Sequence, residues 1–208
     1  MVSTIPREQI LTAATAVFAE VGYAGARVDE IAERAGVNKA MLYYHVGNKQ
    51  ELYRAVLRSV LEHIRRVFAG VVASTPDPVA RIQALARAIA RFAQESPDPP
   101  SVLFREVATG GKNLDDDLLR EVAVVFDGVR ALYEEGSDRG VFRKTDPFVA
   151  HFVSVGALLF LVGSKPLRAR IGAMTGAGVE IEATPDELAA RFADLLLEGL
   201  RVRTETSS

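Results

Sequence analysis

The sequence predicts an all-α protein, in which a small N-terminal three-helix domain is followed by a larger helical domain, with about nine helices in total. Along nearly the whole chain of 208 residues, apolar side chains recur at intervals of three and four, and no run of any length alternates as a strand would. Residues 28–49, VDEIAERAGVNKAMLYYHVGNK, contain two short amphipathic helices with a tight turn between them.

The N-terminal domain is expected to hold three helices, at residues 7–21, 28–34 and 39–46. Gly22 ends the first helix. Gly36 can adopt the positive φ that a tight turn between two packed helices requires. Asn38 stands where its side chain can cap the third helix by accepting a backbone N–H. These features predict a helix-turn-helix domain over residues 1–55.

The remaining 56–208 segment is expected to form the second domain, with a long helix over residues 49–72 linking the two. That helix would be roughly 36 Å long at 1.5 Å per residue. Later helices are expected at residues 79–94, 101–109, 115–139, 147–162 and 184–202, with breaks at proline and glycine. Residues 163–184 are expected to be mostly loop, with a helical turn near residues 167–171.

The 39–46 helix has the composition of a helix that enters the major groove of DNA, because it carries one lysine, two tyrosines and a histidine but no acid. Residues 1–55 are neutral by count, whereas the stretch 34–50 has three formal positive charges and no negative one. Contacts with phosphates depend on this local distribution more than on the net charge of −2.

Residues 10–56 resemble the N-terminal domain of the TetR family of one-component transcriptional regulators. The matching patterns are ILTAATAVF from Ile10, EVGY from Glu20, VDEIAERAGV from Val28 and LYYHVGNKQEL from Leu42. The resemblance implies a homodimer that binds operator DNA and responds to a small-molecule effector. It also implies contacts with the operator backbone by Tyr43, Tyr44, His45 and Lys49.

Other DNA contacts are expected from the start of the 39–46 helix, since the N-terminal residues of a recognition helix face base edges. Lys39 can donate to guanine, and Ala40 and Met41 can contact a thymine methyl group, beside the cap residue Asn38. Arg27 precedes the second helix, where it can reach a phosphate. The alternatives are a solvated lysine at position 39, a loose surface arginine at position 27, and core aromatic rings at both tyrosine positions.

The last two expected helices have the composition of a dimer interface, because the 147–162 helix is apolar nearly all round and must be covered on every side. The expected interface residues are Phe152, Val155, Leu159, Leu188, Phe192, Leu195 and Leu196. An intramolecular core is the alternative. A pocket for a small hydrophobic or aromatic effector is expected to be lined by Phe92, Leu103, Phe104, Phe126, Val129, Tyr133 and Phe152.

Several functions are not expected for this chain. It has no cysteine, and its three histidines lack metal-ligand spacing, so neither a metal nor a cofactor is expected. It has no nucleophile–base pair and no glycine-rich phosphate loop, which argues against an enzyme. The start of the chain lacks a signal pattern and its longest apolar run, 148–162, is too short for a membrane span, so a cytoplasmic protein is expected.

The sequence allows two interpretations at each of two further sites. The Arg105–Glu106 pair, beside Phe104, is either solvated or a polar anchor inside a pocket. His151, in an apolar helix, is either a structural histidine or part of a ligand or metal site. A body that only dimerises or docks a protein partner, without a small ligand, is the alternative to the effector sensor.

Overall fold

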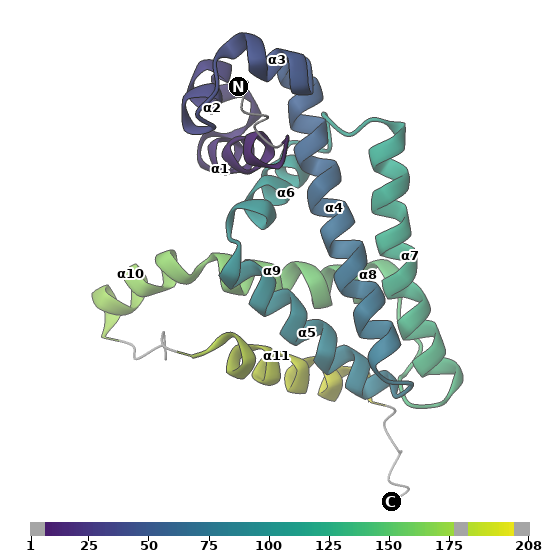
Figure 1. The fold of residues 1–208 in the computed structure, drawn as a ribbon. Helices are drawn as coiled ribbons and strands as arrows, with labels where there is room; N and C mark the ends of the chain where they lie inside the picture. Colours follow the sequence, from purple (N-terminus) through teal and green to yellow (C-terminus); the bar gives the residue numbers. More distant parts are fainter. Residues whose placement is uncertain (1–6, 177–182, 202–208) are drawn as a thin grey trace, which may run out of the picture. The chain divides into compact units, whose positions relative to one another are not determined.

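The computed structural model describes residues 7–176 and 183–201, which are helical apart from turns and one isolated bridge between Phe142 and Arg201. The expectation of an all-α fold is confirmed. In chain order (Figure 1) the helices are α1 Arg7–Gly25, α2 Val28–Arg34, α3 Lys39–Val46, α4 Lys49–Ser74, α5 Pro78–Glu95, α6 Asp98–Ala108, α7 Asp116–Asp138, α8 Pro147–His151, the π-helical η1 Phe152–Gly156, α9 Ala157–Gly163, α10 Lys165–Thr175 and α11 Pro185–Leu200.

The chain divides into two compact units. The first, here called the N-terminal unit, combines residues 1–63 with 96–122, and the second, the C-terminal unit, combines 64–95 with 123–208. The chain therefore passes between the units within α4, between α5 and α6, and within α7. This division differs from the sequence-based one at residue 55, because α6 packs on α1, a contact that joins residues far apart in the chain.

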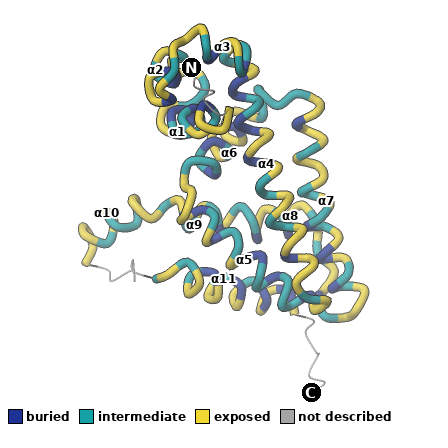
Figure 2. The backbone as a smooth tube through the Cα atoms, in the orientation of Figure 1, coloured by how far each residue is buried: buried dark blue, intermediate teal, exposed yellow. Residues whose placement is uncertain are grey.

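The core of the N-terminal unit is formed by apolar side chains at helical spacing on α1 to α4. Phe18, Ile31, Leu42 and Leu52 are fully buried. The Phe18 ring meets that of Tyr53 edge to face, with centroids 4.7 Å apart, a geometry that aromatic rings favour. Figure 2 shows buried stretches on each of the helices α1 to α4.

Helix α6 is fixed to α1 by a side chain that the sequence left unassigned. The Arg105 guanidinium donates to the carbonyl oxygens of Ala19 and Glu20, at 2.9 and 2.8 Å. These carbonyls precede Gly22, whose φ of 73° kinks α1. Arg105 therefore satisfies carbonyls that the kink releases from the regular helical hydrogen-bond pattern.

Glu106, the next residue, is a polar anchor inside the N-terminal unit. It is buried, and its carboxylate accepts hydrogen bonds from the Tyr53 hydroxyl at 2.9 Å and from the Asn113 backbone and side-chain N–H groups at 2.7 and 3.0 Å. A buried carboxylate needs such donors, because an unpaired one would pay the full cost of desolvation. The solvated alternative for the Arg105–Glu106 pair is therefore wrong for Glu106.

The C-terminal unit is built around α5, which packs against α9 and α11. Small side chains allow the close approach: one buried cluster is formed by Ala86, Ala90, Leu158, Ala189 and Ala193. A second cluster joins α5, α7 and α11 and is formed by Ile82, Val129, Leu132, Tyr133, Phe142, Ala150, Leu197 and Leu200.

Two segments of the C-terminal unit differ from the sequence-based expectation. The helix expected over 147–162 is interrupted by the π-helical turn η1, where the Ser154 hydroxyl donates to the Ala150 carbonyl oxygen at 2.6 Å. The expected loop over 163–184 instead contains the eleven-residue helix α10. Residues 177–182 of that expected loop lie outside the described residues.

Among residues 7–176 and 183–201, no single helix combines the length and apolar character of a bilayer span. Only the bent pair Pro147–Gly163 and Lys165–Thr175 reaches that length and composition together.

Candidate nucleic-acid interface

Helices α2 and α3 are joined by a tight turn with Gly36 at its centre. Gly36 has a φ of 65°, as the sequence predicts. The Gly36 and Val37 N–H groups donate to the carbonyl oxygens of Glu33 and Ala32, at 3.0 and 2.9 Å. These bonds satisfy carbonyls at the end of α2, so the turn is fixed by the backbone.

Both ends of α3 are defined by side chains and glycine. The Asn38 Oδ1 accepts the Met41 N–H at 2.8 Å, so the expected N-cap is confirmed. At the other end Gly47 takes a φ of 71°. Asn48 then caps α4, and Glu51 accepts the Asn48 N–H in return at 2.8 Å, the reciprocal arrangement of a capping box.

Helix α3 presents one face to its own unit and another to solvent. Leu42 and Val46 are buried, whereas Tyr43 is 42% and Tyr44 84% exposed. Neither tyrosine is therefore a core aromatic, which excludes that alternative. Of the remaining predicted contact residues, Arg27, Asn38, Lys39 and Ala40 are exposed and Met41, His45 and Lys49 are partly exposed.

Lys39 forms an ion pair with an acid from the preceding helix. Its Nζ lies 2.9 Å from Asp29 Oδ1, and both side chains are about half exposed. The hydrogen bond between them raises the pKa of Lys39 and lowers the pKa of Asp29. Lys39 is therefore neither buried nor a loose surface lysine: one side of its ammonium group is engaged, and the group lies at the start of α3.

The positive charge of Arg34, counted over residues 34–50 in the sequence, is paired with two acids in the structure. Its guanidinium donates to both carboxylate oxygens of Glu20 at 2.6 and 2.7 Å and to Glu30 at 2.8 Å. These hydrogen bonds raise the pKa of Arg34 further. The charge count over 34–50 missed these acids because both lie outside that stretch.

Lys49 is placed by the end of α1. Its Nζ lies 3.4 Å from the Ala24 carbonyl oxygen and 4.8 Å from the centroid of the Tyr23 ring, a cation–π distance. It stands at the first position of α4, where free backbone N–H groups also favour an anion. Arg27 is the N-cap residue of α2 and makes no side-chain cap bond there.

The predicted effector-pocket residues are dispersed in the structure. Val129 and Tyr133 are packed in the core of the C-terminal unit, and Phe126 stacks near Phe148 and His151 with centroids 4.5 and 5.2 Å away. Phe152 is exposed, and Phe92 is partly buried. Leu103 and Phe104 belong to the N-terminal unit.

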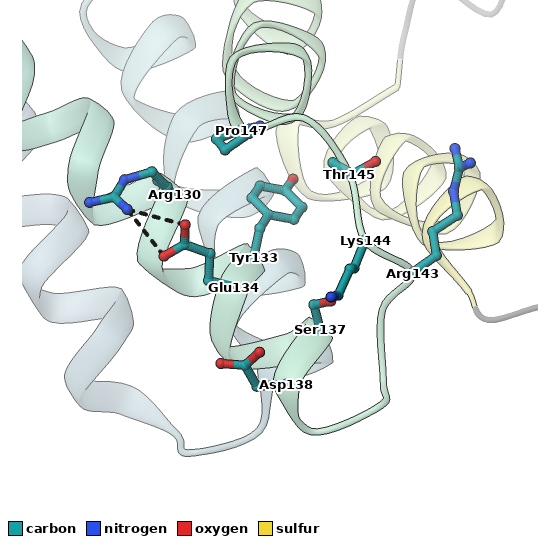
Figure 3. Close-up of a pocket in the computed structure, with 9 residues that line it drawn as sticks. All are labelled: Arg130, Tyr133, Glu134, Ser137, Asp138, Arg143, Lys144, Thr145 and Pro147. Atoms are coloured by element: carbon teal, nitrogen blue, oxygen red, sulfur yellow. Dashed lines mark hydrogen bonds and ion pairs between the residues drawn. The ribbon is translucent and has the colours of Figure 1, made fainter.

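Figure 3 shows a hollow in the C-terminal unit with a volume of about 220 Å³. Of the predicted pocket residues, only Tyr133 borders it. Its other walls come from α7, the segment before α8 and the first residue of α8, namely Arg130, Glu134, Ser137, Asp138, Arg143, Lys144, Thr145 and Pro147. These polar residues carry no helical apolar pattern, so nothing in the sequence marked them. The hollow differs in character from the apolar pocket that was expected.

The predicted dimer residues leave apolar surface uncovered in a single copy of the chain. Phe152 and Leu195 are exposed, and Val155, Leu159, Leu188, Phe192 and Leu196 are partly exposed. Phe148 and Phe160 add to this surface. The His151 ring lies 5.4 Å from that of Phe152, between centroids, and burial lowers the pKa of His151. In the described part of the chain, no three side chains of His, Asp or Glu are grouped as a metal site.

The fold and the exposed α3 define the chain as a helix-turn-helix DNA-binding protein. Residues 10–56 match the family model described as "Bacterial regulatory proteins, tetR family". This match confirms the resemblance: residues 10–56 carry the DNA-binding domain found in TetR-family transcriptional regulators.

Relatives cover nearly the whole chain. The HTH-type transcriptional regulator RutR of Escherichia coli K12 is 28% identical over 199 residues, 95% of this chain and 91% of RutR. The HTH-type transcriptional repressor NicS of Pseudomonas putida is 25% identical over 197 residues, 94% of this chain and 92% of NicS. The crystal structure of AibR in complex with isovaleryl coenzyme A and operator DNA superposes with a TM-score of 0.72 at 20% identity, covering 92% of this chain and 97% of AibR.

Proposed function

We propose that this protein is a cytoplasmic, ligand-responsive repressor that binds operator DNA as a homodimer, with α3 in the major groove. The exposed face of α3 carries the proposal: Lys39, Tyr43 and Tyr44 point away from the core that Leu42 and Val46 anchor. Lys39 and its neighbours Ala40 and Met41 read base edges, and Tyr43, Tyr44, His45, Lys49 and Arg27 contact the phosphate backbone.

Operator binding of this kind requires a dimer, because one recognition helix gives too few base contacts for specific binding. A two-fold dimer doubles those contacts and sets half-sites about 34 Å or a multiple of it apart. The uncovered apolar side chains of α8, η1, α9 and α11 supply a surface that a second copy would cover.

The effector is a small hydrophobic or aromatic molecule bound in the C-terminal unit. A relative named as a repressor, and a structure that holds isovaleryl coenzyme A together with operator DNA, support such a coupling. Helices α4 and α7 each run from one unit into the other, so a change in the C-terminal unit has a continuous path to the N-terminal unit. If the effector weakens operator binding, the operator weakens effector binding by the same factor.

A second candidate is a regulator whose C-terminal unit only dimerises or docks a protein partner. It is favoured by Val129 and Tyr133, which were expected to line an apolar pocket and are instead packed in the core. A thermal-shift screen separates the two: small apolar compounds that raise the melting temperature and lower operator affinity support the sensor, and a complete absence of such compounds supports the second candidate.

The DNA contacts are tested by footprinting the DNA that flanks the coding region and then measuring operator affinity. Tyr44→Ala and Lys49→Ala should each weaken binding about tenfold, or roughly 1.4 kcal/mol, without changing the melting temperature. Val107→Ala, an exposed apolar position on α6, is the control and should bind as the unchanged protein does. If Tyr44→Ala and Lys49→Ala both bind the operator as tightly as the unchanged protein, the proposed contacts of α3 and α4 with DNA are refuted.

The salt dependence of operator affinity gives an independent test. The logarithm of the association constant should fall linearly with the logarithm of salt concentration, with a slope of about −0.9 for each phosphate contacted. Lys49→Ala should make this slope shallower by about one contact. A flat salt response of the unchanged protein would contradict backbone docking.

A further inference from the structure

Helix α10 is encoded locally, although the segment was expected to be mostly loop. Pro166 occupies the first turn, where its missing N–H costs nothing. Gly176 follows the helix in the left-handed region with a φ of 63°, and its N–H donates to the Gly172 carbonyl oxygen at 3.1 Å. The start and end of α10 therefore have the residues that define a helix.

Helix α10 has no buried side chain within its own copy of the chain, although Arg168, Ala169 and Gly172 on one side are partly covered. Across the described residues, none of the side chains of α10 is buried, and Figure 2 shows it in exposed and intermediate colours throughout. Leu167, Ile171 and Met174 are spaced by four and three residues and form one apolar stripe, in which Met174 is 87% exposed. An isolated helix of eleven residues is marginal in water, so this stripe needs a cover.

The charge of α10 indicates what kind of surface covers it. Lys165, Arg168 and Arg170 give the helix three positive charges and it has no acid. Helix α11 has the opposite balance, with four acids and one arginine. On the solvent side of α11, Leu195 is 77% exposed and is flanked by the exposed acids Asp194 and Glu198.

We propose that α10 docks on α11 of a second copy of this chain, with Met174 and its stripe against Leu195 and the basic side chains toward Asp194 and Glu198. The proposal rests on the homodimer of the proposed function and extends its interface. Only Ser164 separates α9 from α10, so the stripe continues the exposed apolar surface of Phe160 and its neighbours. The two-fold symmetry makes the contact twice, once from each copy.

The contact does not form within one copy, since both the α10 stripe and Leu195 remain exposed there. Helix α10 would therefore bury its apolar stripe only when two copies associate. Each Å² of apolar area removed from water would stabilise the dimer by about 25 cal/mol. Opposite charge on the two helices favours this pairing over a pairing of α10 with α10, which would bring six positive charges together.

Cross-linking between separate chains tests the contact directly, because the natural chain has no cysteine. Met174→Cys in one full-length chain and Leu195→Cys in a second, differently tagged chain are co-expressed and oxidised. We expect a covalent heterodimer on a non-reducing gel. Ala173→Cys, about 100° from Met174 around α10, paired with Leu195→Cys is the matched control and should cross-link at least tenfold less. Equal yields from the two pairs, or no product from either, would overturn the proposal.

Dimer stability gives the second measurement. Leu167→Gln combined with Met174→Gln should raise the dimer dissociation constant at least tenfold in sedimentation or mass photometry, whereas Ala173→Gln should leave it unchanged. Both stripe positions are exposed in the single copy, so the folded monomer tolerates the change. An unchanged dissociation constant, with loss of binding to phosphatidylglycerol vesicles, would overturn the proposal in favour of a lipid surface.

These outcomes are separable from those for the proposed function. If the natural chain is monomeric, both the dimeric repressor and the contact between α10 and α11 are refuted. If the dimer binds operator normally but shows no cross-link between α10 and α11, only the proposed α10–α11 contact is refuted.

Discussion

Replacing Gly47 by alanine should destabilise the N-terminal unit more than any comparable glycine replacement in its turns. A Cβ at this position would lie 2.0 Å from Oε2 and 2.8 Å from Cδ of Glu51. The φ of 71° also falls in the region where a residue with a side chain is strained. Glu51 can move aside, but only by giving up the hydrogen bond that its carboxylate accepts from Asn48.

The expected loss of unfolding free energy is about 2 kcal/mol. Roughly 1 kcal/mol comes from a side chain at positive φ with a ψ of −145°, a conformation that residues other than glycine rarely adopt, and about 1 kcal/mol comes from the lost capping interaction at the start of α4. Gly36→Ala supplies a matched control, since its φ is 65° but a Cβ there meets no described atom within 4 Å, so only about 1 kcal/mol should be lost. Gly70→Ala, inside α4 and also unobstructed, should stabilise by about 1 kcal/mol.

Urea unfolding followed by circular dichroism at a fixed protein concentration measures the three differences, and hydrogen exchange of the first amides of α4 localises the effect. Gly47→Ala should also weaken operator binding, because this turn sets the direction of α3 relative to α4. Equal losses for Gly47→Ala and Gly36→Ala would refute the reasoning from Glu51.

Three further outcomes are expected. Tyr53→Phe should cost about 2 kcal/mol of unfolding free energy in urea titrations, since it removes a buried hydrogen bond to the Glu106 carboxylate; a loss below about 0.5 kcal/mol would show that Glu106 does not need this donor. His151 has a lowered pKa, so the unfolded chain binds the proton more readily, and stability should fall as pH drops below about 6.5. His151→Gln should flatten that part of the stability profile, and an unaltered profile would contradict the assignment. Asp29→Asn frees Lys39 and removes a negative charge, so affinity for non-specific DNA should rise and the salt slope should steepen by about 0.9, as filter binding across salt concentrations can check; an unchanged slope would argue that Lys39 does not reach DNA.

Local features of the helix-turn-helix could be predicted from the sequence alone. The bounds expected for the second and third helices, residues 28–34 and 39–46, are those observed for α2 and α3. The reason is that Gly36 and Asn38 act on their own neighbours, through a positive φ and a side-chain cap. Such interactions span only a few residues, so they can be seen in a linear pattern.

Interactions between distant residues could not be predicted in the same way. The ion pair of Lys39 with Asp29 and the packing of α6 on α1 depend on how helices are placed, which the apolar spacing does not specify. Glu106 shows the difference most clearly. Its charge predicts a solvated residue, and its burial depends on donors that the sequence does not mark, namely Asn113 and the hydroxyl of Tyr53, 53 positions away.

The sequence by itself determined the class of protein, the bounds of α2 and α3 and the apolar surfaces of the last helices, because these follow from residue type and helical period. Only the tertiary structure decided which charges of the DNA-facing region are paired, that α10 is a helix without a cover, and that the predicted pocket residues are dispersed. Pairing and burial depend on distances between segments, and a linear order of residues contains no such distances.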